Sequence, residues 1–266
     1  MSRKIILVKL GGSLITNKSK AFSERRDIIT DLVGQVKKAR EKNGFRIIVG
    51  HGGGSYPHVP AEKYKTIEGN INKESIYGAA MVEDAAAQLN RIIVGEFLKQ
   101  KVSAVSVNPS SLLALEGGKV KAVFLDSLVE MLELNVIPVV YGDVIFDSEK
   151  GFTIWSTERL LSLLARELVK RKRRVEKIIH CGETDGVIVE GKVVKEIRAD
   201  NFGEIAKSIY RTEGFDVTGG MMHKVEESLE MAQDGIDSYI VGGNHGGNMY
   251  RAVVGDNFIG TKITAR

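Results

Sequence analysis

The sequence has a single cysteine, Cys181, among its 266 residues. One cysteine cannot form an intrachain disulfide, which excludes a disulfide-stapled scaffold and makes a reducing cytoplasm the expected setting. A run of about 18 apolar residues is also missing, so we predict no membrane span. The apolar run over residues 5–10 is too short for the core of a signal peptide, and no small-residue cleavage site follows it.

Strong charge asymmetry is absent too, because 38 Lys and Arg against 34 Asp and Glu give a net charge of +4. This small excess suits an anionic ligand without requiring nucleic acid. The densest basic run, residues 170–174 (KRKRR), ends a helical pattern and has no aromatic residues among its charges. We interpret it as a solvated helix end rather than a nucleic-acid patch. Internal repeats and low-complexity segments are missing as well, and the length suits one large α/β domain or two tightly joined lobes.

The most informative stretch is residues 46–58 (RIIVGHGGGSYPH), where an apolar run typical of a buried strand ends in glycines. The glycines at 52–54 lack the β-carbons that keep a ligand from the backbone, and consecutive amides in such a loop can bind a phosphate. A glycine-rich turn without a ligand is the alternative. The dinucleotide pattern is excluded, because Ser55 stands where a third glycine is needed and Pro57 and Pro60 obstruct a long helix.

A second glycine loop, residues 11–13, follows the apolar run at 5–10 (IILVKL). Lys9 lies inside that run, where a buried lysine is costly unless it meets an anion, so it is a candidate binding residue. Ser23 is placed to cap a helix that ends at Gly44, which completes a parallel α/β unit. Both loops follow the C-terminal ends of parallel strands, where ligands of α/β sheets bind, so we expect them to border one site.

The rest of the chain continues the alternation of helices and strands. We expect helices over 74–99, 126–135, 157–171 and from 219 onward, strands over 102–107, 136–141, 177–181, 237–241 and 258–263, and hairpins around 117–118, 144–155 and 190–191. Asp126, and either Asp200 or Asn201, are the expected helix caps. Asp143 follows a buried strand, where a turn-forming role and a ligand contact are equally open. Lys224 lies near a helix N-terminus, a placement that a nearby anion would favour.

Several motifs together resemble one superfamily over essentially the whole chain. They are KLGGSLITNK at 9–18, GHGGGS at 50–55 followed by His58, YGD at 141–143, TDGV at 184–187, DVTGGM at 216–221 before Lys224, and GTKI at 260–263. These motifs resemble the amino acid kinase superfamily and, within it, the isopentenyl phosphate kinases. Walker and protein-kinase signatures are absent. The resemblance implies a three-layer αβα sandwich with a mainly parallel central sheet, in which residues 1–175 form a phosphoryl-acceptor-binding lobe and 176–266 a nucleotide-binding lobe.

By that resemblance, the chain uses ATP and Mg²⁺ to convert isopentenyl phosphate to isopentenyl diphosphate and forms a homodimer. Lys9 and Lys18 are implied to lie near the transferred phosphoryl group, with Lys18 as the cation of the transition state, and Lys224 to contact the ATP phosphates. The resemblance implies further nucleotide-side roles for Gly11, Gly12, Ser13, Gly54, Asp143, Thr184, Asp185 and Gly219. It implies acceptor-phosphate roles for Gly53, His58 and Gly142. The Mg²⁺ ion is expected to be held chiefly by phosphates and water, without a protein metal site.

His58 is the more specific mark of this resemblance. A phosphate monoester carries roughly −1.5 to −2 charges, which an imidazole can bind through a charge-assisted hydrogen bond. We therefore interpret His58 as a donor to the acceptor phosphate. There is little reason for His58 to act as a general base, because the attacking phosphate oxygen is already ionised. The remaining alternative is that His58 is a loop histidine without a role in the reaction.

The sequence departs from the family pattern at three places. Residues 55–58 (SYPH) replace the usual SFGH, and Pro57 fixes φ near about −65°, which affects the aim of His58. Residues 156–159 (STER) stand where an SGDD-like segment is usual, and 180–183 (HCGE) replace the usual TDV before Asp185. Alternative functions are a kinase for another small phosphate or phosphonate, and a non-catalytic nucleotide or oxyanion binder on the same fold. The depth of the acceptor pocket is expected to depend on the helix wall at 76–89.

Overall fold

The computed structural model describes residues 3–17, 19–212 and 219–265. An eight-stranded sheet has the order β12-β14-β13-β9-β1-β2-β6-β3. Its strands are β1 (Ile5–Leu10), β2 (Arg46–His51), β3 (Ala104–Ser106), β6 (Ile137–Tyr141), β9 (Val175–Gly182), β12 (Glu196–Ile197), β13 (Asp237–Gly242) and β14 (Gly260–Ile263). The strands from β3 to β13 run parallel, whereas β14 pairs antiparallel with β13. The predicted α/β fold with a mainly parallel central sheet is therefore confirmed.

A second, four-stranded sheet has the order β5-β4-β7-β8, and β10 pairs with β11 in a short hairpin. These strands are β4 (Leu113–Glu116), β5 (Lys119–Val123), β7 (Asp143–Asp147), β8 (Gly151–Trp155), β10 (Ile188–Val189) and β11 (Lys192–Val193). The predicted hairpins around 117–118, 144–155 and 190–191 are thus present. Strand β7 begins two residues after β6 ends, so the smaller sheet adjoins the C-terminal end of β6 in the larger sheet.

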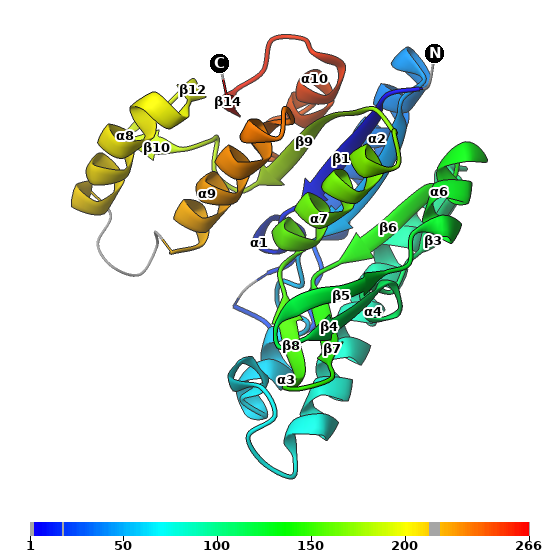
Figure 1. Ribbon diagram of the computed structural model, residues 1–266. Helices are drawn as coiled ribbons and strands as arrows, with labels where there is room; N and C mark the ends of the chain where they lie inside the picture. The colour runs from blue at the N-terminus through cyan, green and yellow to red at the C-terminus, as the bar shows by residue number, and fades with distance from the viewer. Residues whose placement is uncertain (1–2, 18, 213–218, 266) are drawn as a thin grey trace.

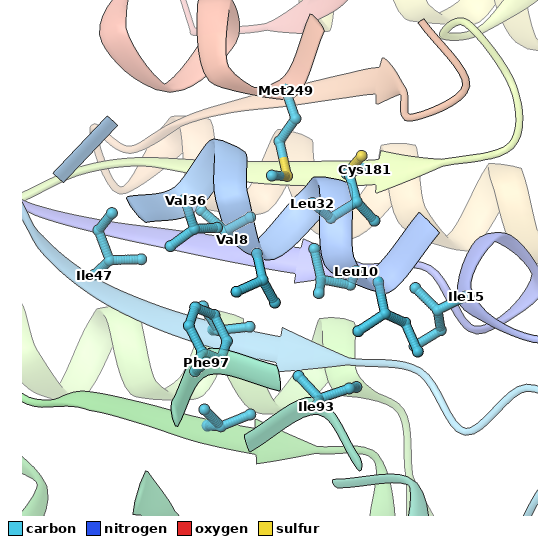
Figure 2. Close-up of a cluster of buried hydrophobic side chains, with 14 of the residues drawn as sticks. Val8, Leu10, Ile15, Leu32, Val36, Ile47, Ile93, Phe97, Cys181 and Met249 are labelled. Atoms are coloured by element: carbon cyan, nitrogen blue, oxygen red, sulfur yellow. The ribbon is translucent and has the colours of Figure 1, made fainter. Parts of the chain in front are cut away.

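Helices cover both faces of the large sheet (Figure 1). They are α1 (Gly12–Ile15), α2 (Arg26–Asn43), α3 (His58–Lys63), the 3₁₀ turn η1 (Thr66–Glu68), α4 (Ser75–Lys99), α5 (Pro109–Leu112), α6 (Asp126–Glu133), α7 (Thr157–Lys170), α8 (Ala199–Thr212), α9 (Gly219–Gln233) and α10 (Asn248–Val254). Successive side chains of a strand point to opposite faces, so β1 contributes to two cores. Val8 and Leu10 pack with α2, α4 and α10, as Figure 2 shows, whereas Ile5 and Leu7 pack with α6, α7 and α9. This arrangement is the predicted three-layer sandwich.

Some predicted helix boundaries are wrong. Ser23 does not cap α2, which begins at Arg26, because the chain before the helix pairs with residues 15–17: the Ser23 carbonyl accepts from the Asn17 N–H at 2.7 Å, and the Arg25 N–H donates to the Ile15 carbonyl at 2.8 Å. The predicted stop is confirmed: Gly44 adopts the left-handed conformation (φ 62°) and its N–H donates to the Arg40 carbonyl. Asp126 is the first residue of α6 rather than its cap.

Two further differences concern the C-terminal part of the chain. Asp200 and Asn201 lie inside α8, which begins at Ala199, so neither is its cap. Helix α10, between β13 and β14, was not predicted from the sequence. Among the described residues, every helix is too short or too polar to cross a lipid bilayer. Cys181 is a free, buried thiol whose pKa burial raises to about 12, so it packs as an apolar side chain.

The parallel strands bring the predicted loops to one end of the large sheet. In the register of the sheet Leu10 lies beside His51, and His51 beside Tyr141. The loops that follow β1, β2 and β6 therefore emerge next to one another. Figure 1 shows the arrowheads of β1 and β6 pointing toward α1 and the smaller sheet. The two glycine loops therefore lie next to each other, as the sequence indicated, and that they border one binding site stays a prediction.

Candidate active site

The loops after β1 and β2 touch backbone to backbone. A β-carbon on Gly12 would lie 2.4 Å from the Gly54 nitrogen, and one on Gly52 would lie 2.7 Å from the Gly12 nitrogen. Gly54 also has a positive φ of 55°, and its β-carbon would lie 2.1 Å from Thr16 Oγ1. No side chain fits at such distances, so these glycines allow the two loops to pack backbone to backbone.

His51, the last residue of β2, supports the glycine loop that follows this strand. Its ring is completely buried, and burial lowers its pKa to about 4, which keeps the imidazole neutral. The contacts fit a single tautomer: Nδ1–H donates to the Gly52 carbonyl at 3.1 Å, and Nε2 accepts from Asn90 Nδ2 at 3.2 Å. Asn90 also donates to the Val139 carbonyl, so one amide links α4, β6 and the loop. The glycine loop thus rests on a rigid neutral network.

A cleft of about 380 Å³ opens beside these loops. The predicted acceptor residues Gly53, His58 and Gly142 line it, and so does Asp143. Its other walls are Ala61, Ile67, Val82 and Ile154, which are apolar, together with Gly52, Pro57 and residues 155–158. Val82 belongs to α4 and to the predicted wall at 76–89. Val82, Ala61 and Ile154 belong to one apolar cluster, so the cleft has an apolar wall in addition to its glycine-rich, polar lining.

His58 is the exposed first residue of α3 and lies at this cleft. Pro57 precedes it with φ −72° and ψ −19°, which are helical values, so the proline starts the short helix. The Pro57 ring occupies the space beside Gly53, where a β-carbon would lie 2.1 Å from Cγ. The departure from SFGH to SYPH therefore leaves the histidine at the cleft.

Asp143 is 1% exposed, and neither of its carboxylate oxygens has a hydrogen-bond partner among the described residues. Burial raises its pKa to about 7; the Val144 amide opposes that rise and the nearby Glu83 adds to it. Trp155 pairs with Asp143 across β7 and β8, and its buried indole nitrogen also lacks a partner within the described chain. The structure places Asp143 in the cleft that holds the predicted acceptor residues.

A cluster of charged side chains comes from β1, α7 and α9. Lys9 is 9% exposed and forms an ion pair with Glu158 at the start of α7. Burial alone would raise the pKa of Glu158, but the charges of Lys9 and Lys224 hold it at about 2. Burial and the charge of Lys9 lower the pKa of Lys224 to about 8. Lys9 and Lys224 come from opposite ends of the chain, and Glu158 interacts with both.

His180 lies beside Lys9 in the register of β1 and β9. It is 5% exposed, and burial lowers its pKa to about 3, so the ring is neutral beside the two lysines. Sequence reasoning assigned no role to His180 and left that of Glu158 in doubt. A carboxylate at a helix N-terminus directly after a strand is the signal that points to Glu158.

A second cavity, of about 480 Å³, lies between the start of α7 and helix α9. Ser156, Glu158 and Arg159 line it from α7, and the lining from α9 consists of Gly220, His223, Lys224, Glu226, Glu227 and Glu230. Ser156 and Glu158 line the first cleft as well. The two cavities therefore adjoin each other at Glu158, the partner of Lys9.

The remaining predicted nucleotide-side residues surround the ends of β1, β9 and β13. The Gly11 N–H donates to the Cys181 carbonyl at 2.7 Å, and Ser13 lies in α1. Thr184 is exposed after β9, and Asp185 contacts His245 Nε2 at 2.8 Å. Gly219 is the first residue of α9. Lys18, the predicted transition-state cation, lies outside the described residues.

Comparison with known proteins gives a consistent result. A family model described as the amino acid kinase family matches residues 4–242. The isopentenyl phosphate kinase of Methanothermobacter thermautotrophicus is 30% identical, over 98% of this chain and 100% of the relative. That of Methanocaldococcus jannaschii is 29% identical, over 95% and 96%. A solved structure titled "X-ray structures of isopentenyl phosphate kinase" matches with a TM-score of 0.80 and 25% identity, over 97% of this chain and 100% of the other.

Proposed function

This chain belongs to the amino acid kinase family, and from that premise we propose that it transfers the γ-phosphoryl group of ATP to isopentenyl phosphate, which yields isopentenyl diphosphate and ADP. The relatives that match it over nearly their full lengths carry the name of that reaction. The proposal extends their activity to this chain.

The observation that carries the proposal is a cleft that has both polar lining residues and an apolar wall. An alkenyl phosphate needs donors for its phosphate and an apolar wall for its hydrocarbon tail, and a cleft of about 380 Å³ offers both. Gly53, His58 and Gly142 belong to the polar lining. Val82 and Ile154 contribute to the apolar wall, where an acceptor carboxylate would find no partner.

We propose that ATP binds in the second cavity. Lys224 lines it, and Lys9 reaches its border through the ion pair with Glu158. A phosphoryl group that passes between the two cavities would move past these cations. Glu158 would keep the lysine ammonium groups in place before the phosphates arrive, because a buried ammonium without a counter-charge is costly.

The reaction requires positioning more than proton transfer. A non-bridging oxygen of the acceptor phosphate attacks the γ-phosphorus, the bond from that phosphorus to the β–γ bridging oxygen breaks, and ADP leaves with the electron pair. The attacking oxygen is ionised near neutral pH, so His58 would serve as a donor rather than a base. Lys9 and Lys18 would offset charge on the moving group, and Lys224 would bind the ATP phosphates.

The loop residues would complete the two binding regions. On the nucleotide side we assign Gly11, Gly12, Ser13, Gly54, Thr184, Asp185 and Gly219. Asp143 lines the acceptor cleft, so we assign it to that region together with Gly53, His58 and Gly142. We also propose that residues 1–175 form the acceptor lobe and 176–266 the nucleotide lobe, with the loops at 11–13 and 54 contacting the nucleotide from the acceptor lobe. We also propose a homodimer, which light scattering in solution would detect.

Mg²⁺ is the expected companion of ATP. The described residues hold no group of three or more His, Cys, Asp or Glu side chains that could bind a metal ion. The ion would therefore be coordinated chiefly by phosphate oxygens and water, which suits the preference of Mg²⁺ for keeping part of its water shell. When bound, it would neutralise charge on the β- and γ-phosphates.

An ADP-release assay tests the proposal. Purified protein is given ATP, Mg²⁺ and one acceptor from a panel of isopentenyl phosphate, shorter alkyl phosphates, acetylglutamate and UMP. Turnover that is fastest with isopentenyl phosphate, with isopentenyl diphosphate identified by mass spectrometry, is the expected result. Preference for another small phosphate would reassign the acceptor, and binding of ATP without turnover of any acceptor would indicate a non-catalytic binder.

A further inference from the structure

A short hairpin connects α1 to α2 beside the candidate active site. Across residues 16–25, the Asn17 N–H donates to the Ser23 carbonyl at 2.7 Å, and an antiparallel bridge closes the base. We name its described residues, 16–17 and 19–25, the Lys18 hairpin, after the lysine that joins them in the sequence. Lys18 itself lies outside the described residues, and its chain neighbours on both sides belong to the hairpin.

Ser55, in the glycine loop after β2, holds this hairpin through three hydrogen bonds. The Phe22 N–H donates to the Ser55 carbonyl at 3.3 Å, and the Ser23 N–H donates to Ser55 Oγ at 3.2 Å. In turn, the Ser55 N–H donates to Thr16 Oγ1 at 3.0 Å. Since Ser55 is 6% exposed, these bonds are shielded from water. The loop beside the acceptor cleft and the hairpin are therefore in direct contact.

Tyr56 adds a side-chain bond to the same contact. Its hydroxyl donates to Glu24 Oε2 at 2.5 Å, and its ring meets the Phe22 ring edge-on at 5.3 Å between centroids. Tyr56 is 4% exposed, so the hydroxyl depends on this partner. Arg26 pairs with the other oxygen of Glu24 at 2.6 Å. The hydrogen bond from Tyr56 is the main reason that the pKa of Glu24 is lowered, so the carboxylate stays ionised.

We propose that Tyr56 and Glu24 are positioning residues for phosphoryl transfer, because their hydrogen bond fixes the Lys18 hairpin against the loop that borders the acceptor cleft. This inference rests on the proposed function, which assigns the transition-state cation to Lys18. A phenylalanine at position 56 would fill the same space and keep the contact with Phe22. The tyrosine hydroxyl is thus the part of the side chain that joins the hairpin to the loop.

Ser55 and Tyr56 together hold the hairpin against the loop after β2. Phe22 at its tip is 45% exposed and has a positive φ of 48°, a conformation that a non-glycine residue adopts only at a cost. A cation that stabilises a transition state must keep its distance to the reacting atoms, and a displacement of about 1 Å can cost about 100-fold in rate. A bond that anchors the hairpin to the acceptor loop therefore bears on kcat more than on substrate affinity.

A double-mutant cycle tests this role. Steady-state kinetics with ATP and isopentenyl phosphate are measured for wild type, Tyr56→Phe, Lys18→Ala and the double variant. We expect Tyr56→Phe to lower kcat about tenfold, with both KM values within about twofold of wild type. In the Lys18→Ala background the same substitution should have no further effect on kcat. Tyr239→Phe is the matched control: it removes a hydroxyl from β13, outside the site, and should leave the kinetics unchanged.

Two results would overturn the proposal: an unchanged kcat for Tyr56→Phe, or an equal loss in both backgrounds, which would show that Tyr56 acts independently of Lys18. Glu24→Ala removes the bond from the other side and should reproduce the kinetics of Tyr56→Phe. Hydrogen exchange supplies a readout that needs no activity, since peptides covering 16–25 should exchange faster in both variants. Wild type without ADP release would instead refute the proposed function, and the exchange experiment would still decide whether the bond anchors the hairpin.

Discussion

Asp143 and Asp147 stand at the two ends of β7 in opposite electrostatic environments. Asp143 is buried without a hydrogen-bond partner among the described residues, and its pKa is raised to about 7. Asp147 accepts hydrogen bonds from the N–H groups of Gly117, Gly118 and two further residues, and despite burial these hold its pKa at about 2. The isosteric changes Asp143→Asn and Asp147→Asn should therefore have different effects on stability as the pH changes.

The size of the Asp143 effect follows from the two pKa values. The unfolded side chain ionises near 3.8 and the folded one near 7, so between these values the folded state binds more protons. By linkage, the free energy of unfolding falls as the pH rises through that window. At about 1.4 kcal/mol per pH unit the loss reaches about 4 kcal/mol above pH 7, and about 2.5 kcal/mol of it develops between pH 5 and pH 8. The amide side chain of the Asp143→Asn variant is neutral throughout and avoids this loss.

Urea denaturation of the ligand-free protein at pH 5 and pH 8 measures the effect. The stability of Asp143→Asn relative to wild type should increase by about 2.5 kcal/mol between the two pH values, and all other titrations cancel in that difference. Asp147→Asn should be less stable than wild type by the same amount at both pH values, because both of its pKa values lie below 5. A pH-independent difference for Asp143→Asn would refute the reasoning, since it would mean that the buried carboxyl group titrates normally.

Three further predictions concern the proposed reaction. His58→Ala should lower kcat/KM for isopentenyl phosphate at least about tenfold, the value of one charged hydrogen bond, with the KM for ATP unchanged; equal kinetics would remove His58 from the site. Lys18→Ala should lower kcat more than it weakens ATP binding measured by calorimetry, and a loss of affinity alone would contradict a transition-state role. Gly53→Ala should raise the acceptor KM because its β-carbon would lie 2.1 Å from the Pro57 ring, whereas Gly95→Ala, with no atom within 4 Å of its β-carbon, should behave as wild type.

The fold could be predicted because its signals are local. Apolar runs that end in glycine loops identified β1 and β2, and helical periodicity identified α2 and α4. The helix caps depended on distant contacts instead. Ser23 has the side chain of a good cap, but its carbonyl accepts from the Asn17 N–H in the hairpin before α2 instead of from the first turn of the helix. Propensity cannot show such a competing tertiary bond.

The candidate site was predictable where backbone geometry decides it. The ends of parallel strands bring Lys9, Gly53 and Gly142 to one edge, and that follows from topology alone. Glu158 was missed because its importance depends on Lys9 and Lys224, which lie far away in the sequence and meet it only in the folded chain. The burial of Asp143 likewise depends on how the smaller sheet packs, which no local pattern reveals.

The contact between Gly12 and the glycines at 52 and 54 has a consequence for how such an enzyme can diversify. With no side chain between the two loops, their spacing equals the thickness of two polypeptide backbones, and substitutions elsewhere can hardly alter it. The walls of the acceptor cleft carry no such constraint. New acceptors could thus be accommodated by exchanging wall residues, while the contact between the two loops is inherited unchanged.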